Sequence, residues 1–178
     1  MNIADQVIAK MRGPRNMHII CVDVTNKCDL ACSNCTRLLE NQTGFWDITP
    51  ENFRLALRSL AGYHGIIAMI GGNPCMHKNF EELCQIFVEE VPNKFQRGLW
   101  TNNVFKHGDL ALETFGTFNI NTHGNHRAES MMIDFAKDAK ARGALVWAYT
   151  GYSDHSPLLT AIKDIYPEQE MWEKIGNC

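Results

Sequence analysis

Three cysteines lie close together near the start of the chain, at Cys28, Cys32 and Cys35. Their spacing, C-x3-C-x2-C, puts three soft thiolates on one short loop, and such ligands hold zinc or iron–sulfur clusters. A closed structural zinc site takes four ligands, and a 4Fe–4S cluster usually takes four cysteines. Three thiolates on a cubane cluster would leave one iron open to bind a molecule that reacts. A zinc site without its fourth ligand and three buried thiols are the alternatives.

Cysteine content and charge indicate the setting in which this loop works. The chain has 178 residues and 7 cysteines, and residues 1–15 lack the apolar segment of a signal peptide. Clustered cysteines in a reducing cytosol more often bind metal or carry out redox chemistry than form disulfides. No apolar run reaches the roughly 20 residues of a membrane-spanning helix. A net charge of −3 gives no strong nucleic-acid signal. We therefore expect a cytoplasmic protein with no membrane partner.

The elements that must position the cysteine loop can be predicted from the spacing of apolar residues. Apolar, β-branched runs predict five strands, at residues 18–24, 65–70, 97–101, 117–121 and 144–150. Apolar residues at helical spacing predict helices near 3–11, from 50 to Gly62, from 80 to Pro92, at 109–113, from about 128 to Gly143, and from Pro157 onward. Thr49 is an expected N-cap, and Asn79 is another, with Glu82 in the capping-box position.

Strands that alternate with helices predict an α/β fold with a parallel sheet and right-handed crossovers. The length, 45% hydrophobic and 21% charged residues are ordinary for one globular domain, which we expect to span residues 1–178. Functional residues of such sheets lie beyond the carboxyl ends of the strands. The cysteine loop directly follows the first expected strand, so it falls at this end.

The loop, with the polar residues Thr25, Asn26 and Lys27 before it, resembles the cluster motif of the radical S-adenosylmethionine (SAM) superfamily. The resemblance implies a parallel-stranded partial (β/α) barrel and an oxidoreductase in which Cys28, Cys32 and Cys35 hold a 4Fe–4S cluster. In that family the open iron binds SAM, and the reduced cluster cleaves it to methionine and a 5′-deoxyadenosyl radical. This radical abstracts hydrogen from the substrate.

Further segments at the expected strand ends match the family more loosely. Gly71, Gly72, Asn73 and Pro74 resemble its GGEP segment, which binds the SAM amino group, with Asn in place of Glu. Alone, this run would indicate an ordinary turn; its position after a buried strand and downstream of the cysteine triplet favours the functional interpretation. The resemblance implies two further sets of cofactor contacts. Thr101 and Asn102 belong to a TNG-like segment, and Asn119, Asn121 and His123 lie at or after the end of the fourth expected strand. Adenine contacts are expected around residues 148–151.

The resemblance covers about residues 16–152 and leaves the end of the barrel open. The family barrel has six strand–helix units, and the sequence predicts five strands. The chain is then a short member, an open barrel or a truncated chain. In each case we expect an exposed apolar edge beside the fifth strand, unless the helix from Pro157 covers it. Cys178 is either a frayed terminal residue or the first of further cluster ligands.

The remaining cysteines and the partners complete these expectations. Cys21 in the first strand and Cys84 on an apolar helix face are expected in the core, and Cys75 is expected to be a small buried side chain. The resemblance implies an unidentified peptide, protein or small-molecule substrate and a low-potential electron donor such as flavodoxin or ferredoxin. The competing hypotheses are a non-catalytic metal-binding or electron-transfer module with zinc or an iron–sulfur cluster, and a degenerate fold that serves as a binding partner.

Overall fold

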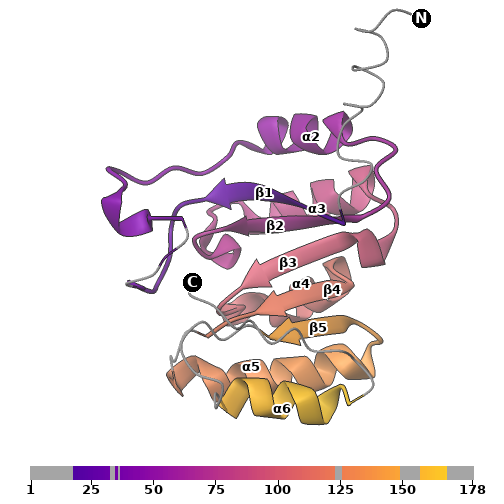
Figure 1. The fold of residues 1–178 in the computed structure, drawn as a ribbon. Helices are drawn as coiled ribbons and strands as arrows, with labels where there is room; N and C mark the ends of the chain where they lie inside the picture. Colours follow the sequence, from indigo (N-terminus) through magenta and orange to yellow (C-terminus); the bar gives the residue numbers. More distant parts are fainter. Residues whose placement is uncertain (1–17, 33–34, 36, 123–125, 149–156, 168–178) are drawn as a thin grey trace, which may run out of the picture.

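The computed structural model describes residues 18–32, 35, 37–122, 126–148 and 157–167. They contain one open sheet of five parallel strands in the order β1-β2-β3-β4-β5 (Figure 1). The strands are β1 Ile19–Thr25, β2 Ile66–Gly71, β3 Arg97–Thr101, β4 Thr117–Ile120 and β5 Leu145–Ala148. The expected strands are all present, and the described part of the last one ends at residue 148.

Helices connect the successive strands (Figure 1). The α-helices are α2 Pro50–Ser59, α3 Phe80–Glu90, α4 Gly108–Thr114, α5 His126–Ala141 and α6 Pro157–Ile165. Short 3-10 turns complete the described elements: η2 Leu39–Asn41, η3 Pro74–Met76, η4 Lys94–Gln96 and η5 Phe105–His107. The helix expected near residues 3–11 lies outside the described residues. No helix in the described ranges is long and apolar enough to cross a membrane.

The two faces of the sheet differ because successive strand side chains point to opposite sides. Most side chains on the face that packs against the helices are fully buried, as with Val24, Met69, Leu99, Phe118 and Val146, while Ile20 and Val22 on the edge strand β1 are partly buried. A chain of edge-to-face aromatic pairs continues this core from α2 to α5. Its centroid distances are 5.6 Å for Phe53–Phe87, 5.7 Å for Phe87–Phe115, 6.2 Å for Phe115–Phe118 and 5.1 Å for Phe118–Phe135. Such pairs stabilise a core by about 0.5–1.5 kcal/mol each beyond the area they bury.

The prediction that Cys21 belongs to the core is wrong. The residue is exposed, because β1 is an edge strand and Cys21 lies on the face opposite the helices. An apolar run that alternates across an edge strand buries only one of its two faces. Cys84 and Cys75 are buried as expected, and burial raises the pKa of each thiol to about 12.

The two expected helix caps have different outcomes. The Thr49 hydroxyl accepts a bond of 3.2 Å from the Asn52 N–H, as predicted for an N-cap. The capping box at α3 does not form. The Asn79 N–H donates to His77 Nδ1 at 3.0 Å, so it is not available to Glu82, and the Asn79 amide instead donates to the Glu82 carboxylate at 2.8 Å.

The sheet is open at β5, as expected. Among the described residues, β5 pairs with β4 alone, and no antiparallel neighbour interrupts the five strands. Helix α6 packs beside α5 against this end of the sheet, with Leu158 and Ile162 fully buried (Figure 1). The Tyr166 hydroxyl donates to the Ala144 carbonyl at 3.0 Å. Leu145 remains 41% exposed, so the helix covers one face of β5 and leaves part of it accessible.

Candidate functional site

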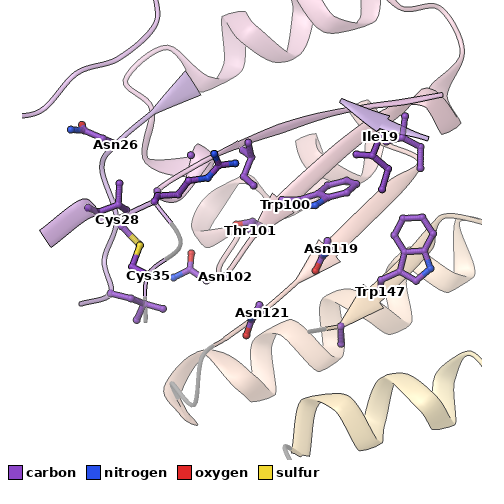
Figure 2. Close-up of a pocket in the computed structure, with 18 of the residues that line it drawn as sticks. Ile19, Asn26, Cys28, Cys35, Trp100, Thr101, Asn102, Asn119, Asn121 and Trp147 are labelled. Carbon is purple, nitrogen blue, oxygen red and sulfur yellow. The ribbon is translucent and has the colours of Figure 1, made fainter. Parts of the chain in front are cut away.

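A cavity of about 950 Å³ occupies the face of the sheet that the helices leave free (Figure 2). At the carboxyl end of the strands it is lined by the cysteine loop and by the ends of β2, β3 and β4. It continues along the sheet to Ile19, Gly65 and Gln96, near the amino ends of the strands. The cavity thus includes the carboxyl ends of the strands, where parallel sheets place their functional residues, and it extends from there along the face of the sheet.

The wall below the strand ends is aromatic and neutral. Strand register aligns Trp100, Asn119 and Trp147 across β3, β4 and β5, and all three side chains line the cavity (Figure 2). The two indole rings meet edge to face, 6.4 Å apart at 74°. Gly98 makes this arrangement possible, because a Cβ at that position would clash with the Trp100 ring. Neither tryptophan was predicted as a site residue from the sequence, although Trp100 lies one residue before the end of β3 and Trp147 one residue before the end of β5.

The three expected metal ligands line one end of the cavity. Cys28, Cys32 and Cys35 are half-buried, and the Cys35 N–H donates to the Cys32 carbonyl at 3.2 Å. Figure 2 labels Cys28 and Cys35 in the cavity wall. Burial raises the pKa of the Cys28 thiol, and the adjacent Asp29 carboxylate acts in the same direction. A metal would have to displace that proton, because thiolates are the ligating form. Among the described residues, no three His, Cys, Asp or Glu side chains are arranged around a common metal position. The donor set nevertheless fits an iron–sulfur cluster chemically, since three thiols share one cavity wall.

The two glycines after β2 let this strand end approach the cysteine loop. The Gly72 N–H donates to the Thr25 carbonyl at 2.8 Å, and the next N–H donates to the Lys27 carbonyl at 2.6 Å. A Cβ on Gly71 would meet the Thr25 carbonyl oxygen, and a Cβ on Gly72 would meet the Lys27 carbonyl oxygen. Both glycines also line the cavity. The lack of side chains therefore allows the backbone contacts between β2 and the cysteine loop, and it also leaves the backbone accessible to a ligand in the cavity.

Asn73 and Pro74 differ from the other expected cofactor residues, because neither lines the cavity. Asn73 is fully buried. Its amide donates to the Asn103 carbonyl at 3.0 Å, and its side-chain oxygen accepts from the Cys75 N–H and the Thr101 hydroxyl, both at 3.0 Å. The side chain is therefore committed to the protein interior, and a contact between Asn73 and a SAM amino group stays a prediction.

The other expected contacts do gather at the cavity. Thr101, Asn102, Asn119 and Asn121 all line it. The Asn102 amide donates to the Asp29 carboxylate at 2.9 Å and so ties the cysteine loop to the end of β3. Its side-chain oxygen is the one buried side-chain polar atom in the described ranges that has no partner. His123 and residues 149–151 lie outside the described residues.

Two ion pairs around the cysteine loop were not predicted from the sequence. Arg37 Nη1 contacts Asp23 Oδ2 at 3.0 Å, with both side chains about one third exposed. Lys27 Nζ contacts Asp47 Oδ2 at 2.6 Å, and the Asp47 side chain is almost fully buried. The Thr25 hydroxyl also donates to Asp47, at 2.7 Å. These contacts fasten the loop to β1 on one side and to the segment before α2 on the other.

Comparison with known proteins finds similarity in structure and not in sequence. No protein-family model and no curated protein matches the chain. The chain superposes on the structure of Streptococcus suis SuiB bound to S-adenosylmethionine with a TM-score of 0.65 at 17% identity, covering 93% of this chain and 42% of that one. The complex of SuiB with the precursor peptide SuiA gives the same TM-score and identity, with 93% and 40% coverage.

A further structure of SuiB matches with a TM-score of 0.64 at 18% identity, covering 93% of this chain and 41% of that one. The chain thus spans about two fifths of the length of these structures. At such low identity the similarity establishes the fold alone. The five parallel strands and their connections confirm the expected fold class, an open α/β sheet of parallel strands, and the SuiB structures share this fold.

Proposed function

We propose that this chain is the core of a radical SAM enzyme. Cys28, Cys32 and Cys35 would supply three thiolates to a 4Fe–4S cluster, and SAM would occupy the adjacent cavity. When bound, the two groups supply reductive cleavage of SAM to methionine and a 5′-deoxyadenosyl radical, which takes hydrogen from the substrate. The observation that supports this proposal is the gathering of three thiols, two glycines and the side chains of Thr101, Asn102 and Asn121 at one end of a single cavity.

The roles of the chain's own residues follow from their positions. Gly71 and Gly72 would let SAM approach the backbone at the end of β2, and Thr101 and Asn102 would contact it from β3. Asn119 on β4 and Asn121 just after it present amide groups, which can both donate and accept hydrogen bonds to a ribose or a carboxylate. The apolar wall formed with Trp100 and Trp147 would exclude water from a reactive intermediate.

We propose a peptide as the substrate class. Support comes from the SuiB structure solved with a precursor peptide and from the length of the cavity, which runs from the cysteine loop to the opposite end of the strands. Two indole rings and the Asn119 amide lie side by side on the cavity wall between the cysteine loop and the opposite end of the strands. That combination suits an apolar side chain and one backbone amide of a bound segment. A flavodoxin- or ferredoxin-like protein would supply the electron.

The buried hydrogen bonds of Asn73 favour one alternative. Because the hydrogen bonds of this side chain all go to protein atoms, the same thiols could serve a non-catalytic iron–sulfur or zinc module. Anaerobic reconstitution with iron and sulfide, followed by SAM and dithionite, separates the two. Release of 5′-deoxyadenosine supports the enzyme, whereas a stable metal centre without release supports the alternative.

Replacement of the cysteines tests the metal assignment directly. Each of the variants Cys28→Ala, Cys32→Ala and Cys35→Ala should lose the brown chromophore or hold it only briefly, because each removes one of three protein ligands. Cys84→Ala is the matched control, since that thiol is buried in the core and away from the cavity. Iron and sulfide content and visible absorption provide the measurement. A full, stable cluster in all three loop variants would refute the assignment.

A further inference from the structure

Arg37 has a special place in the cavity wall. It is the only Arg, Lys, Asp or Glu among the described residues that line the cavity. It follows Cys35 by two positions in the sequence, so it belongs to the same loop as the proposed cluster ligands. The rest of the described lining consists of thiol, amide, hydroxyl, imidazole, aromatic and aliphatic groups. A charged ligand in this cavity would therefore meet one cationic side chain, beside the cysteines.

The ion pair with Asp23 orients Arg37 without using up its binding capacity. A guanidinium carries five N–H donors and no acceptor. The contact with Asp23 joins a single nitrogen, Nη1, to one carboxylate oxygen at 3.0 Å. Both side chains are about one third exposed, and ion pairs of this kind are weak. A second carboxylate could therefore engage the free edge of the guanidinium or displace Asp23.

We propose that Arg37 binds the carboxylate of SAM, an inference that rests on the proposed function. A planar guanidinium can hold a carboxylate through two parallel hydrogen bonds, which fixes its orientation as well as its position. SAM carries this carboxylate on its methionine part, next to the cysteine loop if it approaches an open iron there. Arg37 lines the cavity at that loop. The residue would thus orient the methionine part.

The test measures binding and needs no substrate. The reconstituted protein is titrated anaerobically in a calorimeter with SAM and with decarboxylated SAM, which lacks only the carboxylate. Arg37→Gln should weaken SAM binding by roughly ten- to a hundredfold, the range of a charge-assisted hydrogen-bonded pair. The same variant should bind decarboxylated SAM as the parent protein does. Arg58→Gln is the matched control, because Arg58 carries the same charge on α2, outside the cavity.

Asp23→Asn separates ligand binding from support of the loop. If Arg37 serves only to fasten the loop to β1, Asp23→Asn and Arg37→Gln should weaken SAM binding equally. If Arg37 binds the ligand, removal of the competing carboxylate should leave SAM affinity unchanged or raise it. Iron content is measured for each protein, and Arg37→Lys, which keeps the charge, replaces Arg37→Gln if the latter cannot hold the cluster. Arg37→Lys should then weaken SAM binding less than Arg37→Gln would, and it should leave the binding of decarboxylated SAM unchanged.

The outcomes distinguish failure of the proposed function from failure of this inference alone. If the reconstituted parent protein does not bind SAM, the proposed function fails, and this inference fails with it. If the parent binds SAM and the Arg37 variants bind it equally well, the inference alone is overturned. An equal loss of affinity for SAM and decarboxylated SAM also overturns it, because the effect would then not depend on the carboxylate.

Discussion

Gly72 should be sensitive to substitution, because its missing side chain lets the end of β2 approach the cysteine loop closely. In Gly72→Ala the new Cβ would lie against the Lys27 carbonyl, 2.6 Å from its carbon atom. Ordinary contacts of this kind need roughly 3.5 Å, so the two segments must separate by about 1 Å. The hydrogen bonds at this point are 2.8 Å and 2.6 Å long and would lengthen past the useful range.

The expected cost follows from these two bonds. Each backbone hydrogen bond contributes about 0.5–1.5 kcal/mol net, so the loss of both lowers the free energy of unfolding by about 1–3 kcal/mol. The change also displaces Lys27, the residue before Cys28, so iron content after reconstitution should fall. Urea unfolding of the reduced, metal-free protein measures the first effect, and iron and sulfide analysis measures the second.

Gly62→Ala is the matched control for this substitution. Gly62 has a φ of +81° but no atom within 4 Å of the Cβ position, so alanine there meets backbone strain without a clash. That strain costs about 1–2 kcal/mol and lies after α2, away from the cavity. Gly62→Ala should therefore lower stability and leave iron content unchanged. Full iron content in Gly72→Ala would refute the argument that the Gly72 contact shapes the loop.

Three more predictions concern the interior around the site. Asn73→Glu should lower the free energy of unfolding by about 1–3 kcal/mol, measured by urea denaturation. A carboxylate has no N–H to donate to the Asn103 carbonyl, and the position is fully buried. Unchanged stability together with tighter SAM binding would contradict this prediction. Phe87→Ala should lower the free energy of unfolding by about 3–5 kcal/mol in the same assay, because Phe87 packs against Phe53 and Phe115 in the core. A decrease below 1 kcal/mol would show that the core repacks and fills the space left by the ring. Burial opposes ionisation of Asp47, but hydrogen bonds from Lys27 and Thr25 outweigh it and hold the pKa of this carboxyl below its usual range. Its folded pKa is thus below the unfolded one, so the stabilisation should be present above about pH 4 and be lost as the pH falls further; Asp47→Asn should flatten this part of the stability–pH curve.

The sequence by itself determined the fold class and the location of the chemistry. Five apolar runs that alternate with helical spacing are enough to predict parallel strands, because such strands need crossover helices. The cysteine triplet after the first run then falls at the carboxyl end of the sheet, where the structure has it. Caps were less predictable, since the Asn79 N–H found a partner in His77, which local pattern rules do not consider.

Other features were decided by tertiary structure, because they depend on which strand lies at the edge and which side chains meet across the chain. Cys21 is exposed although its run is apolar, since β1 has one strand neighbour and one free face. Asn73 lies in a GGEP-like segment, yet bonds to Thr101, Cys75 and Asn103 turn its side chain inward. Arg37 lies in the cavity wall and pairs with Asp23, a partner 14 positions away on β1. A local motif records which residues follow one another; the direction of a side chain is set by partners that only the folded chain brings within hydrogen-bonding distance.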